Sequence, residues 1–246
     1  MATSEPHRSP VRLLPILRGS DRLTAALAFA VESDLPAAGP DFLCGSEVTY
    51  FAGLKFERRQ RSYLLGRYAA KLAVRELVGQ PDLTRIEIRR GVFEQPLVSC
   101  AGTEGCGVSI SHSHDMATAL AFPLGHTMGI DVERLDAAHF STLQSQLSTK
   151  EADWVEAAGE RKLEWATAIW TAKEALSKVL GSGMMSPIHI YSLTELRLLS
   201  IANWEGCFQN FAQYKSLSWA GVGSVLSMVL PKRSSPEKDW DFRGMF

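Results

Sequence analysis

The chain has 246 residues, of which 46% are hydrophobic and 22% are charged, enough for one large domain or two small ones. Its 26 basic residues nearly balance 27 acidic residues, which excludes a general electrostatic attraction to nucleic acid or to an anionic membrane. The longest wholly apolar run, 25–31, is too short to cross a bilayer, and the four cysteines contain no C-x-x-C pair. We expect a cytoplasmic protein with reduced thiols.

The two ends of the chain share a composition rich in proline, serine and charge. Residues 1–20 contain Arg8, Arg12 and three prolines in place of the apolar stretch of a secretory signal. Residues 232–246 are similarly polar. We expect both segments to be loose, with the folded part of the protein between them.

An internal similarity recurs at a constant offset along the chain. Residues 70–79 align with residues 172–181, and residues 86–88 align with residues 188–190. Each copy predicts a helix that ends at a glycine, a short loop and then a strand. Few identities are involved and this pattern is common, so chance similarity is the alternative explanation.

The repeat favours an α+β fold of two pseudo-repeated α+β halves, residues 21–124 and 125–231. Each half contains a strand-like run that ends in proline, at 117–123 and 225–231. We expect the active site to lie in the cleft between the halves.

A segment with four arginines, 58–67, predicts a basic helix, and a solvated basic face explains these arginines taken singly. Further on, residues 109–113 (Ser-Ile-Ser-His-Ser) form the predicted end of a strand. An isolated histidine such as His112 is more often an ordinary hydrogen-bonded side chain. His114 and Cys106 lie nearby, but no second pair of metal-ligand residues appears, so we expect no zinc site.

The segment Gly129-Ile130-Asp131-Val132-Glu133 predicts a short strand with apolar and acidic faces. Asp131 and Glu133 share one face, with Cα atoms about 7 Å apart. Two carboxylates so placed repel each other unless a cation lies between them, and Mg²⁺ prefers such oxygen ligands. On this motif alone, an edge strand with a solvated acidic face is the simpler interpretation.

The next strong helix pattern surrounds Trp170, Glu174 and Lys178, which are spaced four residues apart on one face. The opposite stripe is apolar and predicts burial. Glu174 and Lys178 form either an ordinary surface pair that contributes about 0.3 kcal/mol, or a metal ligand followed one turn later by a phosphate-binding cation.

Taken together, these motifs resemble the Sfp-type 4′-phosphopantetheinyl transferases. The resemblance rests on G-x-D-x-E at 129–133 and W-x-x-K-E-A-x-x-K at 170–178. It extends to S-x-x-E at 148–151, which also fits a capping box, to the basic helix and to the S-x-S-H-S strand end. The family often has a lysine before proline in the loop that precedes this strand, where this chain has Gln95.

The resemblance implies an enzyme that transfers the 4′-phosphopantetheine group from coenzyme A to a serine of an apo carrier protein and releases 3′,5′-ADP. It implies Mg²⁺ held by Asp131, Glu133 and Glu174. Glu174 is the expected base, acting directly or through a water, and Lys178 the expected cation on the leaving phosphate.

The same resemblance assigns the nucleotide end of coenzyme A to Arg59, Arg67, Ser111 and His112, with Lys178 on the phosphate chain. It leaves open what replaces the missing lysine at Gln95, for which Arg89 and Arg90 are candidates.

Two other functions use the same residues. A magnesium-dependent phosphodiesterase would need the same carboxylates and lysine, although the balanced charge argues against nucleic acid as substrate. A non-catalytic module that binds coenzyme A or a carrier protein is the second alternative. The motifs do not identify the acyl or peptidyl carrier, and the internal repeat favours a monomer, because one chain would supply both sides of the cleft.

Overall fold

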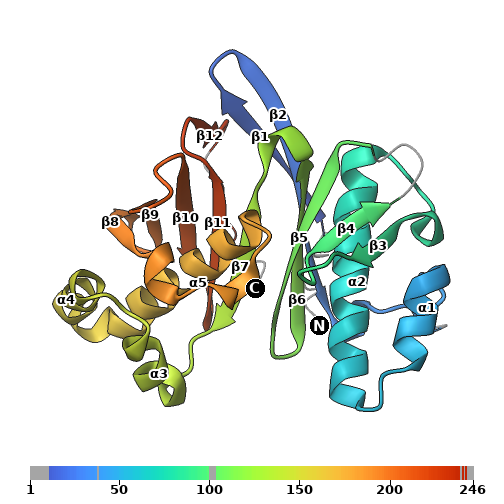
Figure 1. The fold of residues 1–246 in the computed structure, drawn as a ribbon, viewed down its shortest axis with the longest axis horizontal. Helices are drawn as coiled ribbons and strands as arrows, with labels where there is room; N and C mark the ends of the chain where they lie inside the picture. The colour runs from blue at the N-terminus through green and yellow to red at the C-terminus, as the bar shows by residue number, and fades with distance from the viewer. Residues whose placement is uncertain (1–10, 38, 100–103, 239, 241, 243–246) are drawn as a thin grey trace, which may run out of the picture.

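The structure, a computed structural model, describes residues 11–37, 39–99, 104–238, 240 and 242. The chain forms two five-stranded antiparallel sheets, each covered on one face by a long helix (Figure 1). The first sheet has the order β12 (Ser234–Pro236), β1 (Val11–Arg18), β2 (Asp21–Val31), β6 (Met116–Pro123), β5 (Cys106–Ser113). The second has the order β7 (Gly129–Arg134), β11 (Ser224–Pro231), β10 (Tyr214–Ala220), β9 (Asn203–Phe208), β8 (Leu193–Ser200).

A two-stranded ribbon and five α-helices complete the regular structure of the described residues. The ribbon pairs β3 (Glu87–Arg90) with β4 (Pro96–Ser99), and the helices are α1 (Gly45–Ala52), α2 (Glu57–Val78), α3 (Phe140–Ser145), α4 (Thr149–Ala157) and α5 (Lys162–Val179). Short 3-10 turns lie at 32–34, 83–85, 124–126, 137–139, 159–161, 183–185 and 188–191. No helix in the described ranges is both long and apolar enough to cross a membrane.

Alternation along the strands explains the layers. In β2, Leu27 and Phe29 face the second sheet across a shared core, whereas Ala28 and Ala30 pack under helix α2. In β11, Leu226 and Met228 likewise join the shared core, while Val225 and Val229 pack under α5. Because successive side chains of a strand point to opposite faces, each sheet is apolar on both sides.

The helices bury the stripes that the sequence predicts. On α2, Leu65, Leu72 and neighbouring alanines are buried, and each fully buried leucine contributes roughly 1.5–3 kcal/mol. The helix ends because Gly79 adopts a left-handed conformation, with φ of 70°, and its N–H bonds to the carbonyl of Arg75. Gly181, just after α5, has a φ of 66°.

A buried lysine–glutamate pair occurs at matching places in the two halves. The Nζ atoms of Lys71 and Lys173, which align in the sequence repeat, lie 2.6 Å from Oε2 of Glu47 and of Glu151, respectively. Each glutamate lies in the first turn of a short helix, Glu47 in α1 and Glu151 in α4. The Oε1 atom of each glutamate accepts a backbone N–H from the strand that follows the long helix. The donor is Ile88 at 3.0 Å for Glu47 and Leu193 at 2.8 Å for Glu151. The same buried ion pair in both places supports two related halves. The mixture of helices and antiparallel sheets confirms the α+β class.

Three details differ from the expectations. Residues 11–18, expected to be loose, form strand β1, because Leu14 and Ile16 alternate into the shared core and are fully buried. Within the expected loose tail, β12 pairs with β1, so the chain returns to the first sheet after completing the second. Residues 1–10, 239, 241 and 243–246 of the two expected loose segments lie outside the described part of the chain. Residues 188–191 form a 3-10 turn, and the strand expected there begins at Leu193.

Candidate active site

Strand β7 and helix α5 bring an acidic cluster against one lysine. The Nζ atom of Lys178 donates to Oδ1 of Asp131 at 2.7 Å and to the carbonyl of Ile130 at 3.1 Å. Asp131 is almost fully buried, whereas Glu133 and Glu174 are half-buried beside it. The expected grouping of residues from two motifs that are distant in sequence is therefore present, with Lys178 directly on a carboxylate.

The close approach of strand and helix depends on Gly129. A Cβ atom at this position would collide with the carbonyl oxygen of Ala175 and lie 2.8 Å from the side chain of Val179. Only glycine lets the backbone of β7 lie directly on α5. This contact sets Asp131, two residues along the strand, within reach of Lys178, one turn along the helix from Glu174.

The carboxylates disturb each other electrostatically. Burial, followed by the charges of Asp131 and Glu174, raises the pKa of Glu133 to about 7. Burial and the charge of Asp131 raise the pKa of Glu174 to about 7, while Lys178 opposes both shifts. A cation would relieve this repulsion, because a positive charge favours the ionised forms of Glu133 and Glu174.

The donor atoms fit a hard divalent cation in type. They are carboxylate oxygens, and Oδ2 of Asp131 is buried without a hydrogen-bond partner. Within the described ranges, however, no three or more His, Cys, Asp or Glu side chains are grouped so that they could hold a metal as they stand. Asp131, Glu133 and Glu174 therefore offer suitable ligands rather than a finished cage, and side-chain adjustment would have to accompany binding.

A basic pocket lies on the α2 side of strand β5. Arg59, Arg67 and His112 all line it, together with Tyr63 and Arg90. The predicted grouping of the two arginines with the histidine is therefore present, although the segment that carries them is far from His112 in the sequence.

His112 packs against α2 where that helix has a glycine. A Cβ atom at Gly66 would collide with the imidazole, so the glycine makes room for the ring. The His112 side chain as a whole is nevertheless exposed, on the side that faces the pocket, so desolvation comes from the side packed against α2. Desolvation by the surrounding protein, followed by the positive charge of Lys178, lowers the pKa of His112 to about 4, and Arg67 adds to the effect. The imidazole is therefore neutral near pH 7. An anion that enters the pocket would raise its pKa, because a negative charge favours the protonated form.

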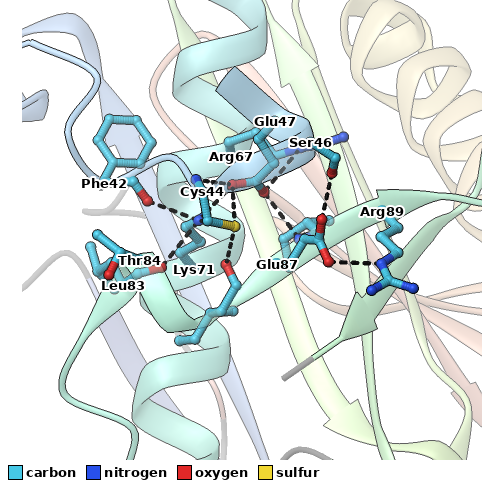
Figure 2. Close-up of polar contacts among 12 residues, drawn as sticks. Phe42, Cys44, Ser46, Glu47, Arg67, Lys71, Leu83, Thr84, Glu87 and Arg89 are labelled. Atoms are coloured by element: carbon cyan, nitrogen blue, oxygen red, sulfur yellow. Dashed lines mark hydrogen bonds and ion pairs between the residues drawn. The ribbon is translucent and has the colours of Figure 1, made fainter. Parts of the chain in front are cut away.

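Arg67 is oriented by two residues that sequence reasoning missed. Its guanidinium lies 4.7 Å from the centre of the Tyr63 ring, and its Nε atom lies 3.7 Å from Oε1 of Glu47. Glu47 is itself immobilised by Lys71 (Figure 2). The Nε atom has no hydrogen-bond partner, so the guanidinium retains capacity to donate. The signal that could have found Glu47 is the repeat, since Ser148-x-x-Glu151 has its counterpart at Cys44-x-x-Glu47.

Ser111 lies with the carboxylates and not in the basic pocket. Its side chain is buried on the side of β5 away from His112, and its hydroxyl donates to Oδ1 of Asp131 at 2.6 Å. The resemblance assigned Ser111 to the nucleotide end of coenzyme A. The geometry instead favours a role beside Asp131, because adjacent residues of a strand point to opposite faces.

A comparison with known families matches the segment that carries the acidic cluster and Lys178. Residues 127–223 match the 4′-phosphopantetheinyl transferase superfamily. The matched segment is less than half of the chain and contains Asp131, Glu133, Glu174 and Lys178. It indicates a transferase of the 4′-phosphopantetheinyl type. A search of curated proteins finds no match.

A second pocket lies next to the basic pocket and has lining residues from both halves. It is lined by Phe93, Gln95 and Pro96 from the first half and by Lys178 and Val179 from the second. The two pockets share part of the 94–96 loop. Gln95, at the position where the resemblance leads us to expect lysine, accepts through its side-chain oxygen from the backbone N–H of Phe93 at 2.9 Å.

Of the two arginines considered as substitutes for that lysine, Arg90 is the better placed. It lines the basic pocket, lies 4.7 Å from the centre of the Tyr50 ring and pairs with Glu94. Arg89 is paired with Glu87 at 2.7 Å and lines a neighbouring pocket. Arg90 therefore supplies a cation to the basic pocket, whereas Gln95 lines the second pocket.

Proposed function

We propose that the protein transfers 4′-phosphopantetheine from coenzyme A to a serine hydroxyl of an apo acyl or peptidyl carrier protein, with Mg²⁺, and releases 3′,5′-ADP. The observation that carries the proposal is the contact of Lys178 with Asp131, beside Glu133 and Glu174, in a segment that matches the transferase superfamily. The basic pocket supports it, since a ligand with separated phosphates needs cations at two places.

The residues divide between binding and chemistry. Arg59, Arg67 and His112 would hold the nucleotide end, where the 3′-phosphate lies far from the reacting phosphorus. Desolvation lowers the pKa of His112 most, and the positive charges of Lys178 and Arg67 lower it further. A bound phosphate would offset those charges, so His112 would accept a proton as the anion enters. Arg67 needs little reorganisation, since Tyr63 and Glu47 already fix its guanidinium.

In the transfer step, the carrier serine oxygen forms a bond to the β-phosphorus, and the bond from that phosphorus to the bridging oxygen of the pyrophosphate breaks. The serine proton passes to Glu174, directly or through a water. Lys178 would donate to a phosphate oxygen and stabilise the charge that develops on the leaving 3′,5′-ADP. Asp131, Glu133 and Glu174 would hold Mg²⁺, which supplies electrostatic stabilisation to the pyrophosphate.

One chain supplies both parts of the proposed site. The cations of the basic pocket come from the first half and the carboxylates from the second. We therefore propose that the protein acts as a monomer, in the cytoplasm, where coenzyme A and apo carrier proteins would be its partners. Its near-zero net charge gives no reason to add nucleic acid or a membrane to them.

The decisive experiment is mass spectrometry of a panel of apo carrier proteins incubated with the protein, coenzyme A and Mg²⁺. A transferase adds the phosphopantetheine mass to a carrier, and the carriers that react identify the partner class. Hydrolysis of coenzyme A without any labelled carrier would favour a phosphodiesterase instead. Binding of coenzyme A or a carrier with neither product would favour the non-catalytic module.

A further inference from the structure

The two sheets meet at two edge strands, β5 and β7. These strands lie side by side at the centre of the molecule, yet they belong to different sheets (Figure 1). Strand β7 is hydrogen-bonded to β11 on its other side only. The N–H groups on its free edge therefore need partners other than a strand, because an unpaired N–H group away from water is costly.

Three serines of β5 supply those partners. The Oγ atoms of Ser109, Ser111 and Ser113 accept from the backbone nitrogens of Ile130, Val132 and Arg134 at 3.1, 3.3 and 3.0 Å, respectively. The spacing works because side chains on one face of a strand and N–H groups on one edge both recur every second residue. We call this set of three contacts the serine seam.

Two members of the serine seam also touch a carboxylate. The Oγ atom of Ser111 lies 2.6 Å from Oδ1 of Asp131, and that of Ser113 lies 3.4 Å from Oε2 of Glu133. Ser109 stands opposite Gly129, which has no side chain. The motifs S-x-S-H-S and G-x-D-x-E therefore match residue for residue along the seam.

The chemistry of a hydroxyl decides which way each proton points. A serine hydroxyl has one proton to donate and lone pairs to accept. In Ser111 and Ser113 a lone pair is used by a β7 N–H group, so the single proton is available for the carboxylate. In Asp131 the two carboxylate oxygens differ. Oδ1 accepts from both Ser111 and Lys178, whereas Oδ2 has no hydrogen-bond partner.

We propose that Ser111, with a weaker contribution from Ser113, is a positioning residue that fixes the acidic side chains of β7 through the serine seam. The seam joins the halves and at the same time sets the rotation of the Asp131 carboxylate, so that Oδ2 faces an incoming cation. This inference rests on the proposed function only for the identity of that cation. The geometry of the seam is independent of it.

The alternative is that the serines merely join two sheet edges. Ser109 provides a matched control for this alternative, because its hydroxyl accepts the same kind of β7 N–H group but touches no carboxylate. Ser109→Ala and Ser111→Ala remove an equivalent seam contact, and only the second removes a bond to Asp131.

The first test is a double-mutant cycle in protein freed of divalent cations with EDTA, using the urea midpoint of unfolding. We expect the midpoint shifts of Ser111→Ala and Asp131→Ala to be clearly non-additive, and those of Ser109→Ala and Asp131→Ala to add. Additive shifts for Ser111 and Asp131 would overturn the proposal. This test uses neither coenzyme A nor a carrier, so its outcome is separate from that of the transfer assay.

The second test measures Mn²⁺ binding by electron paramagnetic resonance, again without coenzyme A. Loss of a residue that orients a metal ligand typically weakens binding about 10-fold or more, so we expect such a loss for Ser111→Ala and less than about 2-fold for Ser109→Ala. Ser111→Thr, which keeps the hydroxyl, should recover most of the affinity. Equal losses in Ser109→Ala and Ser111→Ala would show that the seam is only a structural joint. If the wild-type protein bound no Mn²⁺, the first test would still decide the proposal.

Discussion

The ammonium group of Lys178 lies 2.7 Å from Oδ1 of Asp131, and this contact ties helix α5 to strand β7 at the centre of the acidic cluster. Sequence spacing pairs Lys178 with Glu174, one turn away on the same helix. The structure pairs it with a carboxylate from another motif. In the proposed function, Lys178 would exchange this carboxylate for a phosphate oxygen of coenzyme A as its anionic partner.

Replacement of the β7 carboxylates should abolish transfer. Asp131→Asn and Glu133→Gln are preferable to alanine variants, because Asp131 is almost fully buried and its removal would leave Lys178 without its partner. We expect each variant to lose about 10²-fold or more in kcat at ordinary Mg²⁺ concentrations, with an unchanged far-UV circular dichroism spectrum. Full activity in both variants would contradict the metal assignment.

If the proposed function holds, Glu174 and Lys178 on α5 should behave unlike an ordinary surface pair. We expect Glu174→Gln to lower kcat about 10²-fold or more, and Lys178→Ala to cost roughly 2–4 kcal/mol of transition-state stabilisation. Glu164→Gln is the matched control, since Glu164 lies on the same helix and pairs with Arg161 at 2.7 Å, away from the site. Steady-state kinetics of the three variants provide the check, and near-normal turnover of Glu174→Gln would remove it from the mechanism.

Adjacent arginines at the start of α2 allow a matched test of the basic pocket. Arg59 lines the pocket and Arg58 does not, although both are exposed. We expect Arg59→Ala to weaken coenzyme A binding about 10-fold and Arg58→Ala to have little effect, because exposed charges away from a ligand contribute little. Isothermal titration calorimetry with coenzyme A and with dephospho-coenzyme A shows whether the 3′-phosphate is the group read. Equal losses for Arg58 and Arg59 would indicate only general electrostatics.

Variants of the two lysine–glutamate pairs should distinguish an effect on unfolding free energy from an effect on coenzyme A binding. Glu47→Gln and Glu151→Gln each disturb a buried ion pair, and we expect each to cost about 3 kcal/mol of unfolding free energy. Only Glu47 also lies beside Arg67, whose counterpart in the second half is Ile169. Glu47→Gln should therefore weaken coenzyme A binding as well, and Glu151→Gln should not. Unfolding curves and calorimetry on both variants test the distinction, and a similar loss of affinity in both would refute it.

His112 should make stability depend on pH. Its pKa in the folded protein is about 4, below the ordinary value of 6.5, so the unfolded chain binds the proton more readily. The contribution of the neutral ring is fully present above pH 6.5 and is lost as the pH falls toward 4. We expect the urea midpoint of His112→Gln to change less than that of the wild type across this range. Parallel curves for the two proteins would show that the histidine is not desolvated.

The sequence by itself determined the local elements and the composition of the carboxylate site. The 3.6-residue periodicity and glycine stops predict α2 and α5, and alternation in residues 129–133 places Asp131 and Glu133 on one face. The α+β class follows from the helix–glycine–strand pattern that recurs in the two halves. Glu174 and Lys178 lie on one face of α5 for the same reason. These features depend on interactions between residues close together in the chain, so the pattern of residue types is sufficient to show them.

Only the tertiary structure decided which of these residues meet. Ser111 and His112 are adjacent in sequence, yet one contacts Asp131 and the other lines the basic pocket, because β5 separates the two sites. The contact between Arg67 and Glu47 depends on how α1 docks beside α2, and the serine seam depends on two sheet edges that meet side by side. Such contacts depend on packing between elements, which sequence periodicity does not specify, since it shows the faces that are apolar or charged and not the partners that those faces will have.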